Sequence, residues 1–194
     1  MPVRGKILNV RKASLDKIQK NAEIMTMIEA FGLSVDNKTM KLTFKPEDLR
    51  YGKIIIMSDA DVDGAHIKNL FYTFIWTFCP DLIQQGYVYA AVPPLYRVTE
   101  TKDKYVYLKD DAALDEYRKN HPGKKLLLTR MKGLGEMDAE ETKILVDDDL
   151  RIINQVTVED VKVADKLFDD LMGESIAPRK KYIKEHSAEA VFQV

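Results

Sequence analysis

Three carboxylates stand at alternate positions in one short segment: Asp59, Asp61 and Asp63. They follow the apolar run Lys53–Met57, which is typical of a strand buried on both faces of a parallel sheet, and they precede Gly64. Ligands of open α/β sheets bind outside the carboxyl ends of the strands, so these acids stand where a site is expected. Carboxylates this close repel one another, and a divalent cation relieves the repulsion. Oxygen ligands of this kind favour Mg²⁺.

Three chemistries share this acidic pattern, and the first two fit it poorly. An EF-hand loop needs a Glu at position 12, where this chain has Leu70, and a helix before the loop rather than a strand. A phosphoaspartyl enzyme of the haloacid-dehalogenase type would use Asp59 as nucleophile and Asp61 as general acid, with Asp147–Asp149 as a second acidic motif. In that family a Thr or Val is expected where this chain has Asp63. Because of this mismatch the phosphatase is kept only as an alternative.

The third chemistry is a phosphodiester site, in which Asp59 and Asp61 hold Mg²⁺ against the attacking and leaving oxygens. The charge pattern favours it. Two blocks, 4–20 and 118–132, each carry six basic residues, against one acid and none respectively, although the net charge of the chain is only −1. Such blocks can follow a nucleic-acid backbone. A non-catalytic scaffold whose charges are merely solvated is the remaining alternative.

Composition limits the class of protein. The chain has 194 residues, 45% of them apolar, so it can bury a core. Its single Cys excludes a disulfide framework and a multi-cysteine zinc site, and fits a reducing compartment. The longest apolar runs are about half the ~20 residues that a membrane span needs, and no signal segment opens the chain. We therefore expect a cytoplasmic protein without a membrane partner.

Apolar periodicity predicts alternating helices and strands around the acidic segment. Ser14 is expected to cap a helix that runs to Phe31 and ends at Gly32. Further helices are expected over 66–78, 111–120, 138–145, 158–172 and 177–188. Strands are expected over 40–44, 53–57, 87–92, 95–99, 104–108 and 125–128. This order indicates the α/β class, with a partly parallel sheet flanked by helices and a helical tail at the carboxyl-terminal end.

Four strings in order resemble the B subunit of bacterial type IIA topoisomerases, the family of gyrase and topoisomerase IV B subunits. They are Pro2–Val10, Lys53–Ile67, Pro93–Tyr96 and Arg130–Met137, and the segment from Leu171 to Ile183 is similar to the family's carboxyl-terminal end. The resemblance covers essentially the whole chain and does not separate gyrase from topoisomerase IV. It implies a Toprim domain, a Rossmann-like α/β unit, over 1–149 and a helical tail over 150–194.

The resemblance also implies roles for individual residues. Asp59 and Asp61 would be catalytic and would bind the metal directly, with Asp63 as a supporting acid. The DNA-binding residues would be Arg4, Lys6, Asn9, Arg130 and Lys132. The cofactor would be Mg²⁺, with Mn²⁺ able to substitute, and ATP would act only through domains absent from this sequence.

The family supplies the rest of the machinery from elsewhere. DNA, upstream B-subunit domains and an A-type subunit that carries the nucleophilic tyrosine would be the partners, in an A2B2 heterotetramer. The family's metal site also uses a Glu from a Glu-Gly-Asp-Ser-Ala motif that this sequence lacks. We therefore expect the chain to support transient double-strand cleavage and religation within a complete topoisomerase, and to be inactive alone. A stand-alone Toprim nuclease is the alternative within this fold.

Overall fold

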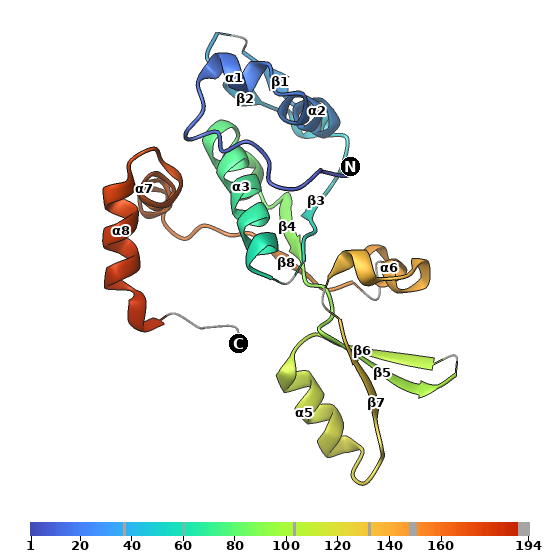
Figure 1. Ribbon diagram of the computed structural model, residues 1–194. Helices are drawn as coiled ribbons and strands as arrows, with labels where there is room; N and C mark the ends of the chain where they lie inside the picture. The colour runs from blue at the N-terminus through green and yellow to red at the C-terminus, as the bar shows by residue number, and fades with distance from the viewer. Residues whose placement is uncertain (37, 60, 103, 132, 148–150, 190–194) are drawn as a thin grey trace. The chain divides into compact units, whose positions relative to one another are not determined.

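The computed structural model describes residues 1–194 except 37, 60, 103, 132, 148–150 and 190–194 (Figure 1). The chain divides into two compact units. The first unit contains residues 1–54, 69–88 and 156–194, and the second contains residues 55–68 and 89–155. The division into 1–149 and 150–194 that the sequence suggests stays a prediction. None of the described helices has the length and apolar character that crossing a bilayer requires.

The amino-terminal part of the first unit differs from the sequence prediction at two points, since it has two helices in place of one and an unexpected short strand at Ser34–Val35. Its elements are α1 (Leu15–Gln19), α2 (Ala22–Phe31) and the hairpin of β1 (Ser34–Val35) and β2 (Leu42–Thr43). Ser14 caps α1 and Gly32, at φ 79°, ends α2, as predicted. The single helix expected across this span is wrong, because the Asn21 side chain accepts the Ile24 N–H and begins a second helix.

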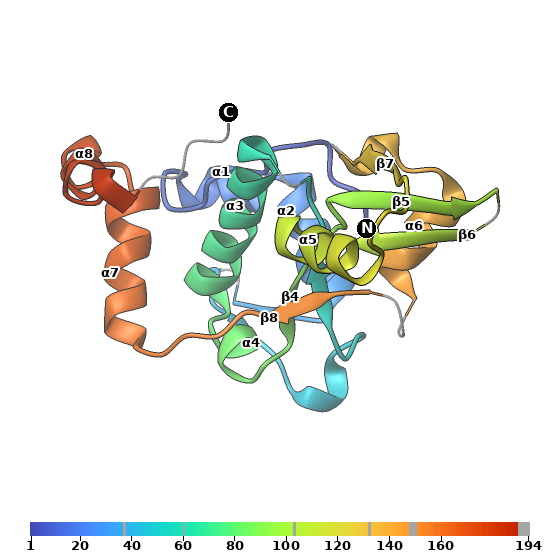
Figure 2. The same ribbon diagram turned by 90° about the horizontal axis from the view of Figure 1, so that it is seen from below.

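The other elements that contribute to the first unit are helical. They are α3 (Val62–Phe78), α4 (Asp81–Gln84), α7 (Val161–Met172) and α8 (Ile176–Glu185), with α7 and α8 separated at Gly173 as predicted (Figure 2). The first turns of α3 belong to the second unit. One face of α3 contributes to the core, since Phe74, Ile75 and Phe78 are buried.

Two three-stranded sheets organise the second unit. One has the order β3-β4-β8 and the other β6-β5-β7. The strands are β3 (Ile54–Ile56), β4 (Val88–Ala91), β5 (Tyr96–Thr101), β6 (Lys104–Leu108), β7 (Leu127–Arg130) and β8 (Ile153–Gln155). The pairs β4–β8, β5–β6 and β5–β7 are antiparallel. β3 and β4 are neighbours in their sheet, and α3 lies between them in the chain. Helical connections of this kind join parallel strands.

Helices α5 (Asp111–Asn120) and α6 (Ala139–Val146) complete the second unit. α5 packs on the β6-β5-β7 sheet through a small core of Val98, Leu108 and Leu114 (Figure 1). The hairpin of β5 and β6 and the helix α5 agree with the sequence prediction, whereas β7 begins two residues later than expected and β8 was not expected. The result is a mixed α/β fold, with the acidic segment at the carboxyl end of β3.

Candidate metal site at the end of β3

The chain turns sharply between β3 and α3. Ser58 is buried, and its hydroxyl donates a hydrogen bond to the Gly64 carbonyl over 2.9 Å. A Cβ on Gly64 would lie 2.1 Å from the carbonyl oxygen of Asp59. Only a residue without a side chain lets the end of the strand lie this close to the first turn of the helix. The turn therefore fixes Asp59 beside the start of α3.

Asp61 caps the amino terminus of this helix. Its Oδ1 accepts the Gly64 N–H over 2.7 Å, and its carbonyl accepts the Ala65 N–H. This is the bond pattern of a helix cap, and a carboxylate at a helix amino terminus is favoured by the helix dipole. α3 therefore begins at Val62 and not near His66 as expected, because the sequence prediction did not assign Asp61 as the cap. Asp61 remains exposed to solvent.

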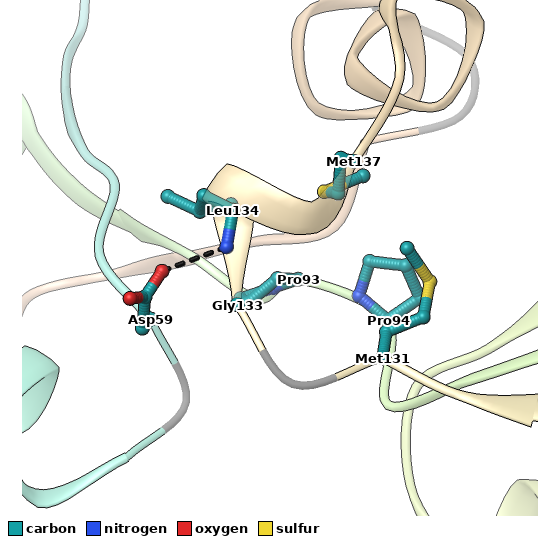
Figure 3. A pocket seen from close by; sticks show the side chains of 7 residues that line it. All are labelled: Asp59, Pro93, Pro94, Met131, Gly133, Leu134 and Met137. Carbon is teal, nitrogen blue, oxygen red and sulfur yellow. Dashed lines mark hydrogen bonds between the residues drawn. The ribbon is translucent and has the colours of Figure 1, made fainter.

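Asp59 is half-buried and faces a loop that follows β7. Its Oδ1 accepts the backbone N–H of Leu134 over 2.7 Å (Figure 3). A Cβ on Gly133 would lie 3.3 Å from the Asp59 carboxylate. Asp59, Gly133 and Leu134 line a small pocket. Two prolines and two methionines complete its lining: Pro93, Pro94, Met131 and Met137. The sequence analysis did not predict the contact between Asp59 and Leu134, because these residues are 75 residues apart. The only sign of the loop in the sequence was the string Arg130–Met137, which contains two glycines.

The carboxylates present suit a hard divalent cation. Asp59 and Asp61 leave the same turn, and Mg²⁺ usually takes one or two carboxylates from a protein. Asp63 is exposed in the first turn of α3. Within the described part of the chain, no three His, Cys, Asp or Glu side chains converge as a ready metal-binding group. The donor set therefore fits a cation that keeps several ligands from water or substrate.

The predicted DNA-binding residues fall into both units. In the second unit Arg130 is exposed at the end of β7, and Lys132 lies outside the described residues. In the first unit Arg4 and Lys6 are exposed. The side chain of Asn9 is engaged within the first unit: its Nδ2 donates to the Met172 carbonyl over 3.0 Å and its Oδ1 accepts the Arg11 N–H. Asn9 thus fastens the amino-terminal segment to the end of α7.

Arg11 extends this attachment to α7. Its guanidinium bonds Asp165 at 2.9 Å and also bonds Asp169, while its Nε donates to Thr77 of α3. The Arg11 guanidinium lowers the pKa of Asp165 below its ordinary value. Trp76 stacks on Phe168, with ring centroids 5.9 Å apart. The segment that follows Arg4 and Lys6 is therefore attached to α3 and α7 through Asn9 and Arg11.

The phosphatase alternative needed a second acidic motif at Asp147–Asp149. Asp148 and Asp149 lie outside the described residues, and Asp147 follows the end of α6.

Comparisons with known proteins give a consistent answer. The family model for the Toprim domain matches residues 1–92, and the model described as the DNA gyrase B subunit, carboxyl terminus, matches residues 123–184. The DNA gyrase B subunit of Mycoplasma pneumoniae is 45% identical over 96% of this chain, and that of Thermus thermophilus is 43% identical over all of it. This chain spans 28% and 30% of those two relatives.

A solved structure shows the same arrangement of elements. The DNA-binding, cleavage and re-ligation domain of Plasmodium falciparum topoisomerase II matches all of this chain and 26% of its own, with a TM-score of 0.77 and 26% identity.

Proposed function

Because the chain belongs to the DNA gyrase B subunit family, we propose that it is the metal-binding part of a type IIA DNA topoisomerase. In this proposal it binds DNA and supports transient double-strand cleavage and religation. A Toprim domain in this family binds a divalent metal, and the finer assignment proposed here is Mg²⁺, with Mn²⁺ able to replace it. The observation that carries the proposal is the single turn from β3 into α3, which carries both Asp59 and Asp61.

The proposed roles follow from chemistry and placement. Asp59 and Asp61 would hold the cation, and Asp63 would add negative charge beside them. When bound, the cation supplies Lewis-acid stabilisation of the oxygens at the scissile phosphate. Arg4, Lys6, Arg130 and Lys132 would contact DNA phosphates, which supply most of the affinity of such interfaces. Asn9 would hold the segment that carries the first two of these cations.

The remaining parts of the proposed reaction come from other polypeptides or domains. An A-type subunit would supply the tyrosine that attacks the DNA, and other B-subunit domains would bind ATP. The assembly would be an A2B2 heterotetramer, and its compartment the cytoplasm. These features are proposed from the family, since the chain spans less than a third of the curated relatives described above.

Charge removal at the two carboxylates tests this function. The chain would be grafted into the corresponding region of a relative from the DNA gyrase B subunit family and assembled with an A-type subunit. Asp59→Asn and Asp61→Asn should each reduce Mg²⁺-dependent plasmid cleavage by at least 100-fold, the order of effect seen when one electrostatic contributor to a transition state is lost. DNA binding should stay within about threefold, because neither acid contacts phosphate without the metal. Unchanged cleavage in both variants would reject the site.

A further inference from the structure

We propose that the backbone N–H of Leu134 positions the Asp59 carboxylate for the cation, and that Gly133 leaves the space beside the loop in which this carboxylate lies. The inference rests on the proposed function, because it concerns the same metal site. It assigns a role to the loop that follows β7. Leu134 and Gly133 are thus positioning residues, acting on the cation only through Asp59.

The hydrogen bond itself is strong. The Leu134 N–H donates to Asp59 Oδ1 over 2.7 Å, within the short range of bonds between a donor and an ionised acceptor. Asp59 is half-buried, so water competes less for this oxygen than it would at an open surface. Among the residues that the structure describes, Leu134 is the donor that this carboxylate uses. The bond therefore sets the direction in which the second oxygen points.

The two glycines of this loop differ in their surroundings. Gly133 has extended backbone, at φ −164° and ψ 161°, which any residue can adopt. Its special feature is contact, since an added Cβ would lie 3.3 Å from both Cγ and Oδ2 of Asp59. An added Cβ on Gly135 would have no atom within 4 Å. A side chain at position 133 would therefore press on the Asp59 carboxylate, and Gly135 offers a matched control.

The loop is held at both ends, by Leu95 on one side and by Arg97 of β5 on the other. Before the loop, the Met131 N–H donates to the Leu95 carbonyl over 2.9 Å. After the loop, Glu141 of α6 pairs with Arg97 of β5, and the Glu141 side chain is only 8% exposed. Glu141 also forms a capping box with Asp138. The loop is thus held before any cation arrives, which keeps the N–H directed at Asp59.

Partners that orient a metal ligand typically contribute 10–100-fold to metal affinity. Leu134→Pro removes this one donor. The change is compatible with the backbone, because Leu134 is the first residue of the 3-10 turn Leu134–Glu136 and its predecessor is extended. Leu134→Ala keeps the N–H and removes the side chain. The ratio between these two variants therefore isolates the hydrogen bond.

The experiment is an Mn²⁺ titration of the full ¹⁵N-labelled chain followed by NMR. Paramagnetic broadening of the Ala65 and His66 amides, near the amino terminus of α3, reports binding even when affinity is low. We expect at least tenfold weaker Mn²⁺ binding in Leu134→Pro than in Leu134→Ala, weaker binding in Gly133→Ala, and unchanged binding in Gly135→Ala. Without metal, Asp59→Asn should also shift the Leu134 amide proton upfield, since the charged acceptor is lost.

The possible outcomes separate this inference from the proposed function. Equal Mn²⁺ affinity in Leu134→Pro and Leu134→Ala, with binding lost in Asp59→Asn, would overturn the positioning role alone. Broadening that is absent, or that persists in Asp59→Asn, would overturn the metal site itself. The amide signals of the core residues Val98, Leu108 and Leu114 report whether each variant is folded. If Leu134→Pro does not fold, Gly133→Ala against Gly135→Ala decides, and equal affinity in that pair overturns the role.

Discussion

At the residue scale, both proposed ligands also hold the backbone around them. Asp61 caps α3, and Asp59 accepts the Leu134 N–H. Alanine at either position would remove an acceptor together with the charge, so a loss of activity could come from local disorder. Asparagine has nearly the same shape and retains one acceptor oxygen, while it removes the charge and replaces the other oxygen with an NH2 group. For this reason the Asn variants separate metal binding from the stability of the turn.

The close approach at Gly64 gives a residue-scale prediction of unusual sign. Alanine is the better helix former by about 1 kcal/mol, so Gly64→Ala in the first turn of α3 would ordinarily stabilise. Here its Cβ would lie 2.1 Å from the Asp59 carbonyl oxygen and 2.8 Å from the carbonyl carbon. We expect a loss of about 1–3 kcal/mol in the free energy of unfolding, as in overpacked sites, measured by urea denaturation.

Gly52→Ala is the matched control for this prediction. Gly52 is exposed, and a Cβ added there would have no atom within 4 Å. Its effect should stay within about 0.5 kcal/mol, as for ordinary surface changes. A Gly64→Ala variant as stable as Gly52→Ala, or more stable than the parent chain, would show that β3 does not end against α3 as described.

At the element scale, one carboxylate joins three elements of the second unit. Glu100 of β5 pairs with Lys104 of β6 at 2.7 Å, accepts the hydroxyl of Tyr117 of α5 at 2.7 Å, and bonds Lys124 at 3.2 Å. These bonds lower the pKa of Glu100 from 4.5 to about 2, and the bond from Lys104 has the largest effect. A depressed pKa means that the folded state favours the charged carboxylate.

The sign of the pH dependence follows from this depressed pKa. The contribution of Glu100 to stability is complete above about pH 4.5 and is lost as the pH falls toward 2. An NMR titration of the Glu100 carboxyl carbon should give a midpoint near 2. Tyr117→Phe retains the ring and removes one donor, so it should raise that midpoint. A midpoint at the ordinary value of 4.5 in the parent chain would contradict the three-element junction.

The elements also show what sequence can and cannot predict. Ser14 and Gly32 carry strong local signals, and the structure confirms both boundaries. Asn21 and Asp61 are polar residues inside or beside helical patterns, where capping competes with helix continuation, and the sequence prediction misplaced both boundaries. Among the predicted site residues, the acidic triplet was visible because its members are adjacent. The Leu134 contact was not, because it depends on how β5 holds a distant loop.

At the scale of the whole molecule, the proposed reaction needs more groups than the two proposed ligands. The chain spans 28–30% of the DNA gyrase B subunits described above, and the proposed site has two carboxylates leaving one turn. A metal held by so few protein ligands gains affinity when substrate phosphate and a further ligand complete its shell. The proposed function therefore requires that cleavage depend on assembly and not on this chain alone.

Plasmid cleavage tests that dependence directly. With Mg²⁺ and supercoiled plasmid, the chain alone should produce no breaks, because the proposed nucleophile is the tyrosine of an A-type subunit. The same chain grafted into a full-length B-type relative and mixed with an A-type subunit should produce breaks that appear after detergent and protease, with protein covalently attached to the DNA. Breaks made by the chain alone, with no protein attached, would instead make it a self-sufficient Toprim nuclease. In that case Asp59 and Asp61 would still bind the metal, but water would replace tyrosine as the nucleophile.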